Sequence, residues 1–294
     1  MRGPQRKLGL RGGLKVAYLG PAGTHSEEAL RASAPPEVEE LPYPTIYDAV
    51  MAVHDGTVDS AIVPIENALE GSVAVTLDTL ALEVEDVRIA AEVVHPIHHC
   101  AIAAAELSLS RVERVVSHPQ ATAQCARFLR EHVPGAEHVS APSTAEAVLS
   151  VCESADSRSV ALGSRLAAEL YDCHVVAENV EDHPDNVTRF VWLARGDAVR
   201  DPGEGAKTSI VFWGGGDDSP GWLVDLLGEL SSRGVNLTRI ESRPRRTGLG
   251  HYMFFADLEG AAGAAPVSEA LEALAGHVQE LRVLGSYGRP LWLN

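Results

Sequence analysis

The chain lacks long apolar runs, and this absence excludes a membrane-spanning protein. No stretch approaches the roughly 20 apolar residues that cross a bilayer. The basic segment 1–13 is not followed by the apolar core of a signal peptide. We therefore expect a cytoplasmic protein without a membrane partner, in which residues 1–13 form a disordered tail or an over-extended start.

Positive charge and cysteine are also scarce. The 24 Lys and Arg residues face 41 Asp and Glu residues, which gives a formal net charge of -17. We expect no nucleic-acid partner, because such proteins need a basic face to meet phosphates. A cleft that binds an anionic ligand must therefore provide Arg, amide N–H and hydroxyl donors that overcome the negative field of the protein. The widely spaced Cys100, Cys125, Cys152 and Cys173 include no CxxC pair, which favours buried, reduced thiols.

Strand-like and helix-like segments alternate from residue 14 to about residue 194. Short apolar segments such as 14–19, 60–65 and 112–117 each run into a polar turn. This alternation predicts an α/β fold with a mostly parallel sheet. Ligands bind outside the carboxyl ends of strands in such sheets, so the repeated polar turns are the first indication of a site.

A polar, glycine-rich stretch at residues 196–206 interrupts this pattern and is typical of a linker. Beyond it, residues 207–288 follow the order strand, helix, strand, strand, helix, strand, which is the ferredoxin-like βαββαβ arrangement. The sequence therefore predicts two domains, covering residues 14–195 and 207–288.

Several motifs, taken together and in this order, resemble the prephenate dehydratase family. They are YLGPAGT at 18–24, PIEN with GSV at 64–73, SHPQ with QC at 117–125, NVTRF at 186–190, and ESRP at 241–244, which resembles a motif of that family's ACT domain. The resemblance runs from about residue 14 to residue 288. It implies conversion of prephenate to phenylpyruvate, water and CO2 in phenylalanine synthesis, with no metal or organic cofactor.

The resemblance also implies a two-lobed catalytic domain like the type II periplasmic-binding proteins, with the active site between the lobes. One lobe would take residues 14–94 plus 177–195, and the other residues 95–176. The C-terminal ACT domain would pair with its counterpart in a second chain, so we expect a homodimer or homotetramer.

The family's essential threonine falls on Thr188, which we expect to donate a proton to the leaving hydroxyl of prephenate. Threonine has no useful free acidity, so its effect must come from geometry in a dry cleft. The family places the neutral side chains of Asn67 and Gln124 in the same cleft. Glu66 is either catalytic or an ion pair that supports its turn, because a free carboxylate would repel a dianionic substrate.

The expected substrate-binding residues combine cationic, hydroxyl, amide and backbone donors. Arg189 suits either a substrate carboxylate or a carboxylate that holds the lobes together, and we favour the first. Phe190 is expected to pack beneath the site. The glycine turn would present backbone N–H groups to an anion at a helix start. The remaining expected contacts are Ala22, Gly23, Thr24, Ser72, Ser117 and Gln120.

Histidines near the motifs raise the question of a metal. His25 stands where the family usually has Phe or Tyr, which puts the local packing in doubt. Strand alternation places His95 and His99 on the face opposite His98, and no carboxylate or cysteine completes a set. We expect no metal site from these three histidines.

The ACT resemblance implies an allosteric site for phenylalanine, with inhibition as the expected effect. The alternative is that this domain only dimerises the chain. Trp222 replaces a small residue of the family, and it either fills part of the pocket, changes ligand choice or faces solvent. The expected effector-binding residues are Gly221, Trp222, Leu223, Val224, Glu241, Ser242, Arg243 and Pro244.

Two other functions remain open at this point. A prephenate decarboxylase of secondary metabolism would lose CO2 without forming an aromatic ring, but Thr188 would then be an unwanted proton donor. A non-catalytic ligand-binding protein would share the lobed fold, but the complete motif set disfavours it.

Overall fold

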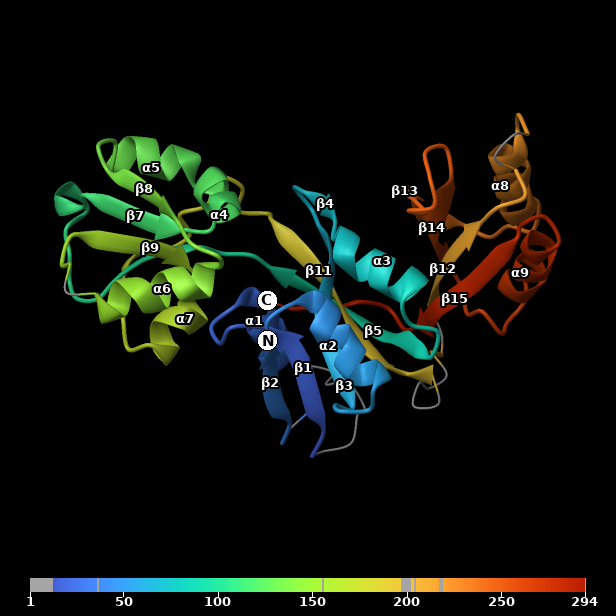
Figure 1. Cartoon of the computed structure of the whole chain (residues 1–294), viewed down its shortest axis with the longest axis horizontal. Coiled ribbons are helices and arrows are strands. Elements are labelled where there is room, and N and C mark those ends of the chain that lie inside the picture. The colour runs from blue at the N-terminus through green and yellow to red at the C-terminus, as the bar shows by residue number, and fades with distance from the viewer. Residues whose placement is uncertain are drawn as a thin grey trace.

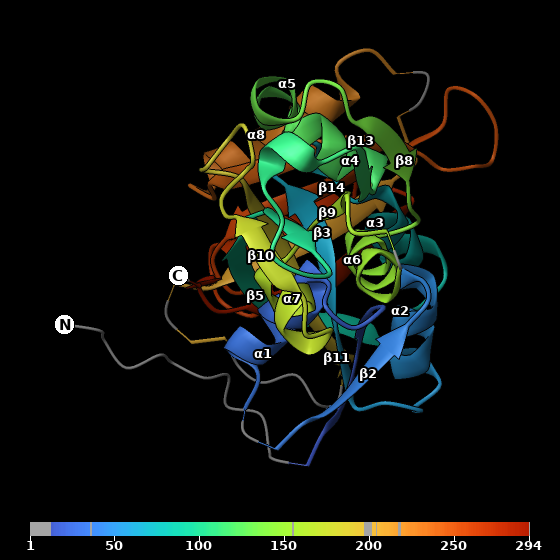
Figure 2. The same ribbon diagram turned by 90° about the vertical axis from the view of Figure 1, so that its left-hand side faces the viewer.

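The computed structural model describes residues 13–293 except 36, 155, 197–201, 204 and 217–218. Residues 1–12 of the expected tail, and 197–201 and 204 of the expected linker, therefore lie outside the described residues. Three β-sheets follow one another along the long axis of the molecule (Figure 1). Viewed along that axis, they lie one behind another (Figure 2). Within the described residues, no helix is long and apolar enough to cross a membrane.

The first sheet forms the middle of the molecule and has seven strands. Its order is β16-β5-β11-β3-β1-β2, with β4 paired to β3. The strands are β1 (Lys15–Leu19), β2 (Glu39–Tyr43), β3 (Ser60–Asn67), β4 (Gly71–Ser72), β5 (Val87–Pro96), β11 (Val187–Arg195) and β16 (Leu291–Trp292). The helices of this first lobe are α1 (His25–Ser33), α2 (Ile46–His54) and α3 (Ala74–Leu82).

The second sheet forms a separate lobe with the order β10-β6-β9-β7-β8. Its strands are β6 (Cys100–Ala103), β7 (Arg114–Ser117), β8 (Glu137–Ser140), β9 (Ser159–Gly163) and β10 (His174–Ala177). Its helical segments are η1 (Leu109–Arg111), α4 (Pro119–Gln124), α5 (Ala126–His132), α6 (Thr144–Glu153) and α7 (Arg165–Leu170).

Both lobes contain mixed sheets rather than the mostly parallel sheet that the sequence predicts. In the first lobe, β1 is parallel to β2 and β3, whereas β11 is antiparallel to β3 and β5. The reason is the path of the chain. It leaves the first lobe along β5 and returns along β11, so these two long neighbours run in opposite directions.

Hydroxyl side chains begin several of these helices. Thr24 caps α1, and Ser143 caps α6 by accepting a hydrogen bond from the Glu146 backbone N–H at 3.1 Å. These caps satisfy N–H groups that a helix start leaves without partners. The capping box that the sequence predicts at residues 143–146 is thus confirmed on its serine side.

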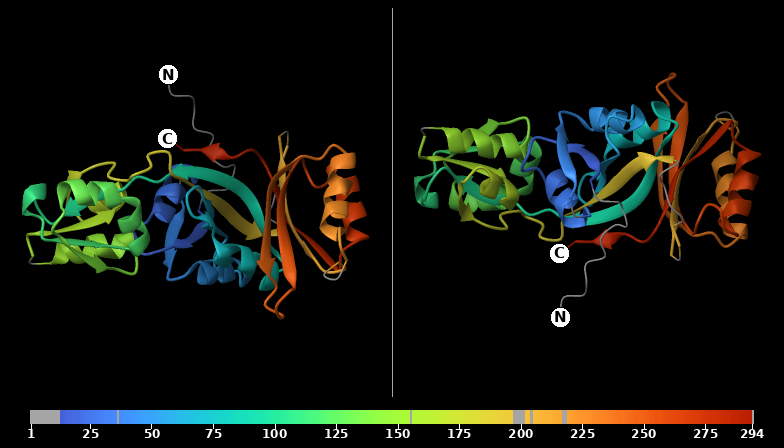
Figure 3. Two further views of the ribbon diagram at one scale, coloured as in Figure 1. Left: turned by 90° about the horizontal axis from the view of Figure 1, so that it is seen from above. Right: turned by 90° about the horizontal axis from the view of Figure 1, so that it is seen from below.

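The third sheet forms the expected βαββαβ domain, with strand order β13-β14-β12-β15. Its elements are β12 (Lys207–Trp213), α8 (Trp222–Ser232), β13 (Leu237–Pro244), β14 (Tyr252–Glu259), α9 (Val267–Ala275) and β15 (Glu280–Tyr287). Helices α8 and α9 cover the outer face, and the other face turns toward the first lobe (Figure 3).

The inner face of the third sheet shares one hydrophobic core with the first lobe. Met253 and Phe255 of β14 belong to the same buried cluster as Ile89 of β5. A Cβ atom on Gly285 of β15 would lie 2.3 Å from the Ile89 carbonyl oxygen, so only glycine permits this approach. Beyond β15 the chain returns to the first sheet, where β16 pairs parallel with β5.

The cysteines differ in part from the expected reduced thiols. Cys100 and Cys125 are buried and free, but Cys152 and Cys173 form a disulfide with their Cα atoms 6.0 Å apart. These two residues lie 21 positions apart in the chain. Helices α6 and α7 pack together, and this contact, which spacing alone does not reveal, brings the two thiols into range.

Candidate active site

Thr188 and Asn67 lie directly opposite each other on neighbouring antiparallel strands, β11 and β3. Asn67 Nδ2 donates a hydrogen bond to Thr188 Oγ1 at 2.9 Å. The Asn67 side-chain oxygen accepts from the backbone N–H groups of Leu69 and Glu70 at 3.0 and 3.1 Å, which holds the amide in orientation. Both Thr188 and Asn67 are buried. The Thr188 O–H donates to no acceptor among the described residues, so its proton is available.

Gln124 approaches this pair from the other lobe, at the last residue of α4. Its Nε2 donates to Glu70 Oε1 at 3.1 Å, and its Oε1 accepts from Asn186 Nδ2 at 3.4 Å. Asn186 in turn accepts from Asn67 at 3.0 Å. A continuous chain of amide groups therefore joins the two lobes beside Thr188.

Sequence reasoning did not select Asn186 or Glu181, although both lie in the segment leading to Thr188. Asn186 is 1% exposed and connects the two predicted amides. Glu181 pairs with Nδ1 of His98 at 2.8 Å and accepts from the His99 backbone N–H at 2.9 Å. Burial would raise the pKa of Glu181, but these hydrogen bonds hold it below its usual value. The first residue of NVTRF was the available signal for Asn186.

Glu66 and Arg189 face away from this amide chain, in contrast to the substrate-binding role favoured for Arg189 from sequence. Successive residues of a strand point to opposite faces, so they lie on the side away from Asn67 and Thr188. Arg189 Nη1 lies 3.1 Å from Glu66 and 2.7 Å from Asp257 of the third sheet. The ion-pair alternative for Glu66 is therefore the one that the geometry supports.

Arg189 is the centre of a network between the first lobe and the third sheet. Its Nε lies 2.8 Å from Glu92, and its Nη2 donates to the Tyr287 hydroxyl at 3.1 Å. Lys207 adds a second cation to Glu92 at 2.9 Å. Burial would lower the pKa of Arg189, but Tyr287 and the surrounding carboxylates raise it above its ordinary value. The guanidinium thus joins two domains and is not free to bind a substrate.

Ser72 also departs from its expected substrate-binding role. Its hydroxyl donates to Glu241 and accepts from Arg239 Nη2 at 2.6 Å, so it contacts β13 instead of the cleft. The β3–β4 pairing turns Ser72 toward the third sheet because it lies opposite Glu66.

The glycine turn of the first lobe contacts the second lobe. The Gly23 backbone N–H donates to Glu27 Oε2 at 2.5 Å, and the Thr24 hydroxyl donates to the Leu19 carbonyl at 2.8 Å. From the second lobe, Tyr171 donates to the Ala22 carbonyl at 2.7 Å. The Gly23 N–H and Thr24 hydroxyl are thus used internally, and their expected role as anion donors stays a prediction.

The last three residues predicted to contact the substrate are Ser117, Gln120 and Phe190. Ser117 is 1% exposed and donates to the Leu162 carbonyl at 2.9 Å, so its hydroxyl is committed within its lobe. Gln120 is exposed in the first turn of α4. Phe190 is buried below the strand and meets the His95 ring edge-on.

The predicted effector segments lie at one end of the third sheet. The register aligns Trp213 with Met253 and Met253 with Arg243, which places the β12–α8 connection and the end of β13 on the same side. Gly221 and Val224 are exposed and Leu223 is half-buried. Arg243, however, forms a two-pronged ion pair with Asp78 of α3, at 2.7 and 3.0 Å.

Side chains along β13 divide between two roles. Glu241 and Arg243 contact the first lobe, whereas Ser242 and Pro244 are exposed. Glu241 and Arg243 alternate along the strand with the exposed residues and form contacts between domains, and their expected effector role stays a prediction.

Trp222 is half-buried and packs against the core of the third domain. Its ring centroid lies 6.4 Å from that of Phe212 and 5.9 Å from that of Phe254. Its Nε1 donates to the His277 carbonyl at 3.0 Å. A Cβ on Gly216 would overlap the Trp222 ring, so the glycine loop makes room for the larger side chain.

Comparison with known proteins decides the family. The sequence profile described as prephenate dehydratase matches residues 16–198, which carry the whole amide chain beside Thr188. The chain belongs to the prephenate dehydratase family. An ACT domain profile matches residues 215–276, within the third sheet and its helices. The expected fold class, a two-lobed α/β domain followed by a ferredoxin-like ACT domain, is confirmed.

Relatives of known activity span nearly the whole chain. A prephenate dehydratase of Amycolatopsis methanolica is 38% identical over 276 residues, covering 94% of this chain and 88% of its own length. A bifunctional chorismate mutase/prephenate dehydratase of Aquifex aeolicus is 40% identical over 286 residues, covering 97% and 76%.

Solved structures show the same arrangement. The prephenate dehydratase of Arthrobacter aurescens, in complex with L-Phe, superposes with a TM-score of 0.86 at 37% identity and covers 94% of this chain and 90% of its own. GqqA, described as a novel type of quorum quenching acylase, superposes with a TM-score of 0.82 at 33% identity, covering 93% and 97%.

Proposed function

We propose that Thr188 of this prephenate dehydratase protonates the ring hydroxyl of prephenate as it leaves. The observation that carries this proposal is the 2.9 Å hydrogen bond from Asn67 to Thr188 Oγ1. Because the oxygen accepts from Asn67, the Thr188 proton remains available for the substrate. The same amide stabilises the negative charge that grows on the oxygen as the proton departs.

The proposed reaction balances without a cofactor. The ring C–O bond breaks with its electron pair on oxygen, and the proton of Thr188 converts the leaving group to water. The Thr188 alkoxide then takes a proton from solvent water, which regenerates the hydroxyl and releases hydroxide. The bond to the ring carboxylate breaks at the same time, so CO2 departs and its electrons enter the ring. The ring becomes aromatic, and this driving force allows a weak but well-placed acid to suffice.

We assign positioning roles to Asn67, Asn186 and Gln124. Their hydrogen bonds at 3.0 and 3.4 Å connect the strand of the first lobe with α4 of the second. The amides are neutral, so they orient a dianionic substrate without adding repulsion. Movement of the lobes would break this chain and disturb the donor.

We further propose that phenylalanine regulates the enzyme through its ACT domain. Support comes from the relative of Arthrobacter aurescens, whose structure is a complex with L-Phe. The exposed segment at Gly221 and the exposed Ser242 and Pro244 are the candidate contacts. Arg189 and Glu241 would transmit the effect, because both connect this domain to the catalytic lobes.

The remaining proposals concern organisation and location. We assign residues 14–195 to the catalytic domain, 196–206 to the linker and 207–288 to the ACT domain. Within the catalytic domain, residues 14–94 and 177–195 form one lobe and residues 95–176 the other. We propose a cytoplasmic enzyme that assembles as a homodimer or homotetramer through its ACT domains, which sedimentation would test.

Incubation of the pure protein with prephenate at neutral pH tests the function. Formation of phenylpyruvate, detected by its absorbance in alkali, is the expected result. A decarboxylated, non-aromatic acid or unchanged prephenate would each refute the dehydratase assignment. Isothermal titration with phenylalanine, tyrosine and tryptophan tests regulation separately, and binding of none of them would refute the effector proposal alone.

A further inference from the structure

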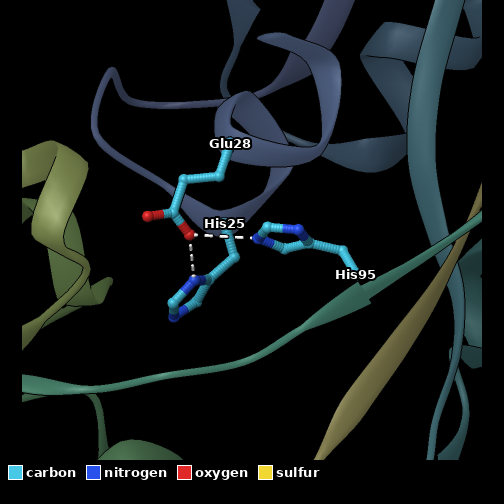
Figure 4. Close-up of side chains that lie close together, drawn as sticks. All are labelled: His25, Glu28 and His95. Atoms are coloured by element: carbon cyan, nitrogen blue, oxygen red, sulfur yellow. Dashed lines mark hydrogen bonds and ion pairs between the residues drawn. The ribbon is translucent and has the colours of Figure 1, made fainter. Parts of the chain in front are cut away.

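Two histidines and a carboxylate converge where helix α1 meets the end of strand β5 (Figure 4). Glu28 Oε2 lies 2.7 Å from Nδ1 of His25 and 3.3 Å from Nε2 of His95. One ligand atom from each residue lies within 4.8 Å of the other two. A tetrahedral zinc ion with bonds of about 2.0–2.1 Å separates its ligands by roughly 3.3 Å, which matches the Glu28–His95 distance and exceeds the 2.7 Å between Glu28 and His25.

Two rigid elements hold the three side chains in place. His25 and Glu28 are three residues apart on α1, so they share one face of the helix. His95 lies on β5, opposite Thr188 of β11. The side chains of His25, Glu28 and His95 are 15%, 21% and 13% exposed, so the cluster is shielded yet reachable.

Each histidine of the cluster has one nitrogen that faces Glu28 and one that faces away from it. A carboxylate only accepts, so in the metal-free protein the protons lie on the two nitrogens that face Glu28. The opposite nitrogens, His25 Nε2 and His95 Nδ1, are then bare, buried and without partners among the described residues. The nitrogens that face Glu28 are thus the ones placed to bind an ion, and the opposite pair is left for other partners.

His99 adds a third bare nitrogen beside the cluster. Its Nε2 lies 3.1 Å from Gln124 Oε1, an acceptor, so the proton lies there and Nδ1 is bare. His99 is 3% exposed, and its Nδ1 has no partner among the described residues. Its ring centroid lies 5.3 Å from that of His25.

We propose that His25, Glu28 and His95 bind a divalent ion of the zinc class, with a fourth position open to water or an anion. Two imidazoles and one carboxylate are a ligand set that zinc uses when one position stays open. The ion replaces the two protons that face Glu28, and each ring then carries its proton on the opposite nitrogen. Each of these opposite nitrogens is then an N–H donor, as on other metal-bound imidazoles.

This site differs from the set that the sequence analysis rejected. His98 pairs with Glu181 and His99 with Gln124, so neither is free to bind the ion. Glu28, which lies 67 positions before His95, supplies the carboxylate that the histidine segment lacks.

Titration of the full-length protein with Co2+ tests the proposal. The protein is first treated with a chelator and dialysed, and no reductant is added, so that the Cys152–Cys173 disulfide stays closed. We expect one equivalent of Co2+ with the visible absorption of a tetrahedral site, and displacement of Co2+ by Zn2+. Glu28→Gln, His95→Gln and His25→Phe should each weaken binding by at least about 10- to 100-fold, the loss that outer partners of a metal already cause.

The matched control is His54→Phe. His54 forms an exposed pair with Asp86 at 2.5 Å, far from the cluster, and its loss should leave Co2+ affinity unchanged. Glu28→Gln keeps a side-chain oxygen that accepts from His25, and circular dichroism confirms that each variant is folded. Absence of a one-equivalent tetrahedral spectrum in the unchanged protein overturns the proposal. So does equal affinity in the three cluster variants and His54→Phe.

Discussion

Thr188 and Arg189 are consecutive residues of β11 whose side chains belong to different parts of the molecule. Thr188 accepts a hydrogen bond from Asn67, in the amide chain that joins the two lobes. Arg189 pairs with Asp257 of the ACT domain at 2.7 Å. The proposed proton donor and the contact between domains are thus separated by one peptide bond. A shift of the ACT domain that moves Arg189 must also move the backbone of Thr188.

The hydroxyl of Thr188 should be essential for turnover. Thr188→Val keeps the shape of the side chain but removes the proton, so kcat should fall by about 100- to 10,000-fold, with little change in substrate binding. Thr188→Ser restores the hydroxyl and should recover much of the activity. Steady-state kinetics on prephenate provide the measurement. Equal rates for the valine and serine variants would contradict the donor role.

Loss of Arg189 should weaken both stability and regulation. Arg189→Met leaves Glu66, Glu92 and Asp257 without their shared cation, at a cost of about 3–5 kcal/mol. Urea unfolding measures this loss, and inhibition assays measure the response to phenylalanine. Arg158→Met removes an exposed pair with Glu113 and should cost at most about 1 kcal/mol. Similar losses for both variants would argue against a buried network.

Asp257 should make the contact between domains sensitive to acid. Burial would raise the pKa of Asp257, but Arg189 lowers it below its usual 3.8. The unfolded chain therefore takes up this proton first as pH falls, so the stabilisation is complete above 3.8 and is lost below it. Free energies of unfolding measured at successive pH values should fall more steeply for the unchanged protein than for Asp257→Asn. Parallel curves would contradict this cause.

Two glycine substitutions should have opposite effects. Gly285→Ala places a Cβ 2.3 Å from the Ile89 carbonyl oxygen, so β15 must move away from β5, at a cost of about 1–3 kcal/mol. Gly228→Ala, inside helix α8, meets nothing within 4 Å and should stabilise the protein by about 0.5–1 kcal/mol. Thermal unfolding distinguishes the two. A neutral Gly285→Ala would show that the close approach is not required.

The disulfide should stabilise the second lobe. Cys152 and Cys173 close a loop of 21 positions, so opening it releases chain entropy equivalent to about 3 kcal/mol. Cys152→Ser should therefore unfold at lower urea concentration than the oxidised protein. The reduced, unchanged protein should match the variant. If reduction leaves the unfolding curve unaltered, the bond does not contribute in this way.

The order of elements and the Thr188–Asn67 pair were accessible from the sequence because both depend on local patterns and ordered motifs. The roles of Glu66 and Arg189 were only partly accessible: the ion pair of Glu66 was one of two open alternatives, and a carboxylate partner for Arg189 was the less favoured one. Alternation along a strand places them on the face opposite Asn67 and Thr188. Only the folded chain shows that Asp257 lies on that face. A motif indicates which residues are important, but it does not show which part of the molecule packs against each face of the strand.

The sequence also did not predict which residues far apart in the chain come into contact. Glu28 and His95 lie 67 positions apart, and Cys152 and Cys173 lie 21 apart. Each pair is brought together by the packing of elements that carry no motif for it. His95, His98 and His99 lie in one segment of the sequence, but their side chains pair with Glu28, Glu181 and Gln124 respectively.

The return of β16 to the first sheet gives the ACT domain two anchors. The chain enters this domain after β11 and leaves it through β16, and both strands pair with β5. Met253 and Phe255 also share a buried core with the catalytic sheet, so the two chain connections and this core act together. A displacement of the ACT domain would therefore reach β5 and β11 through the backbone as well as through side chains.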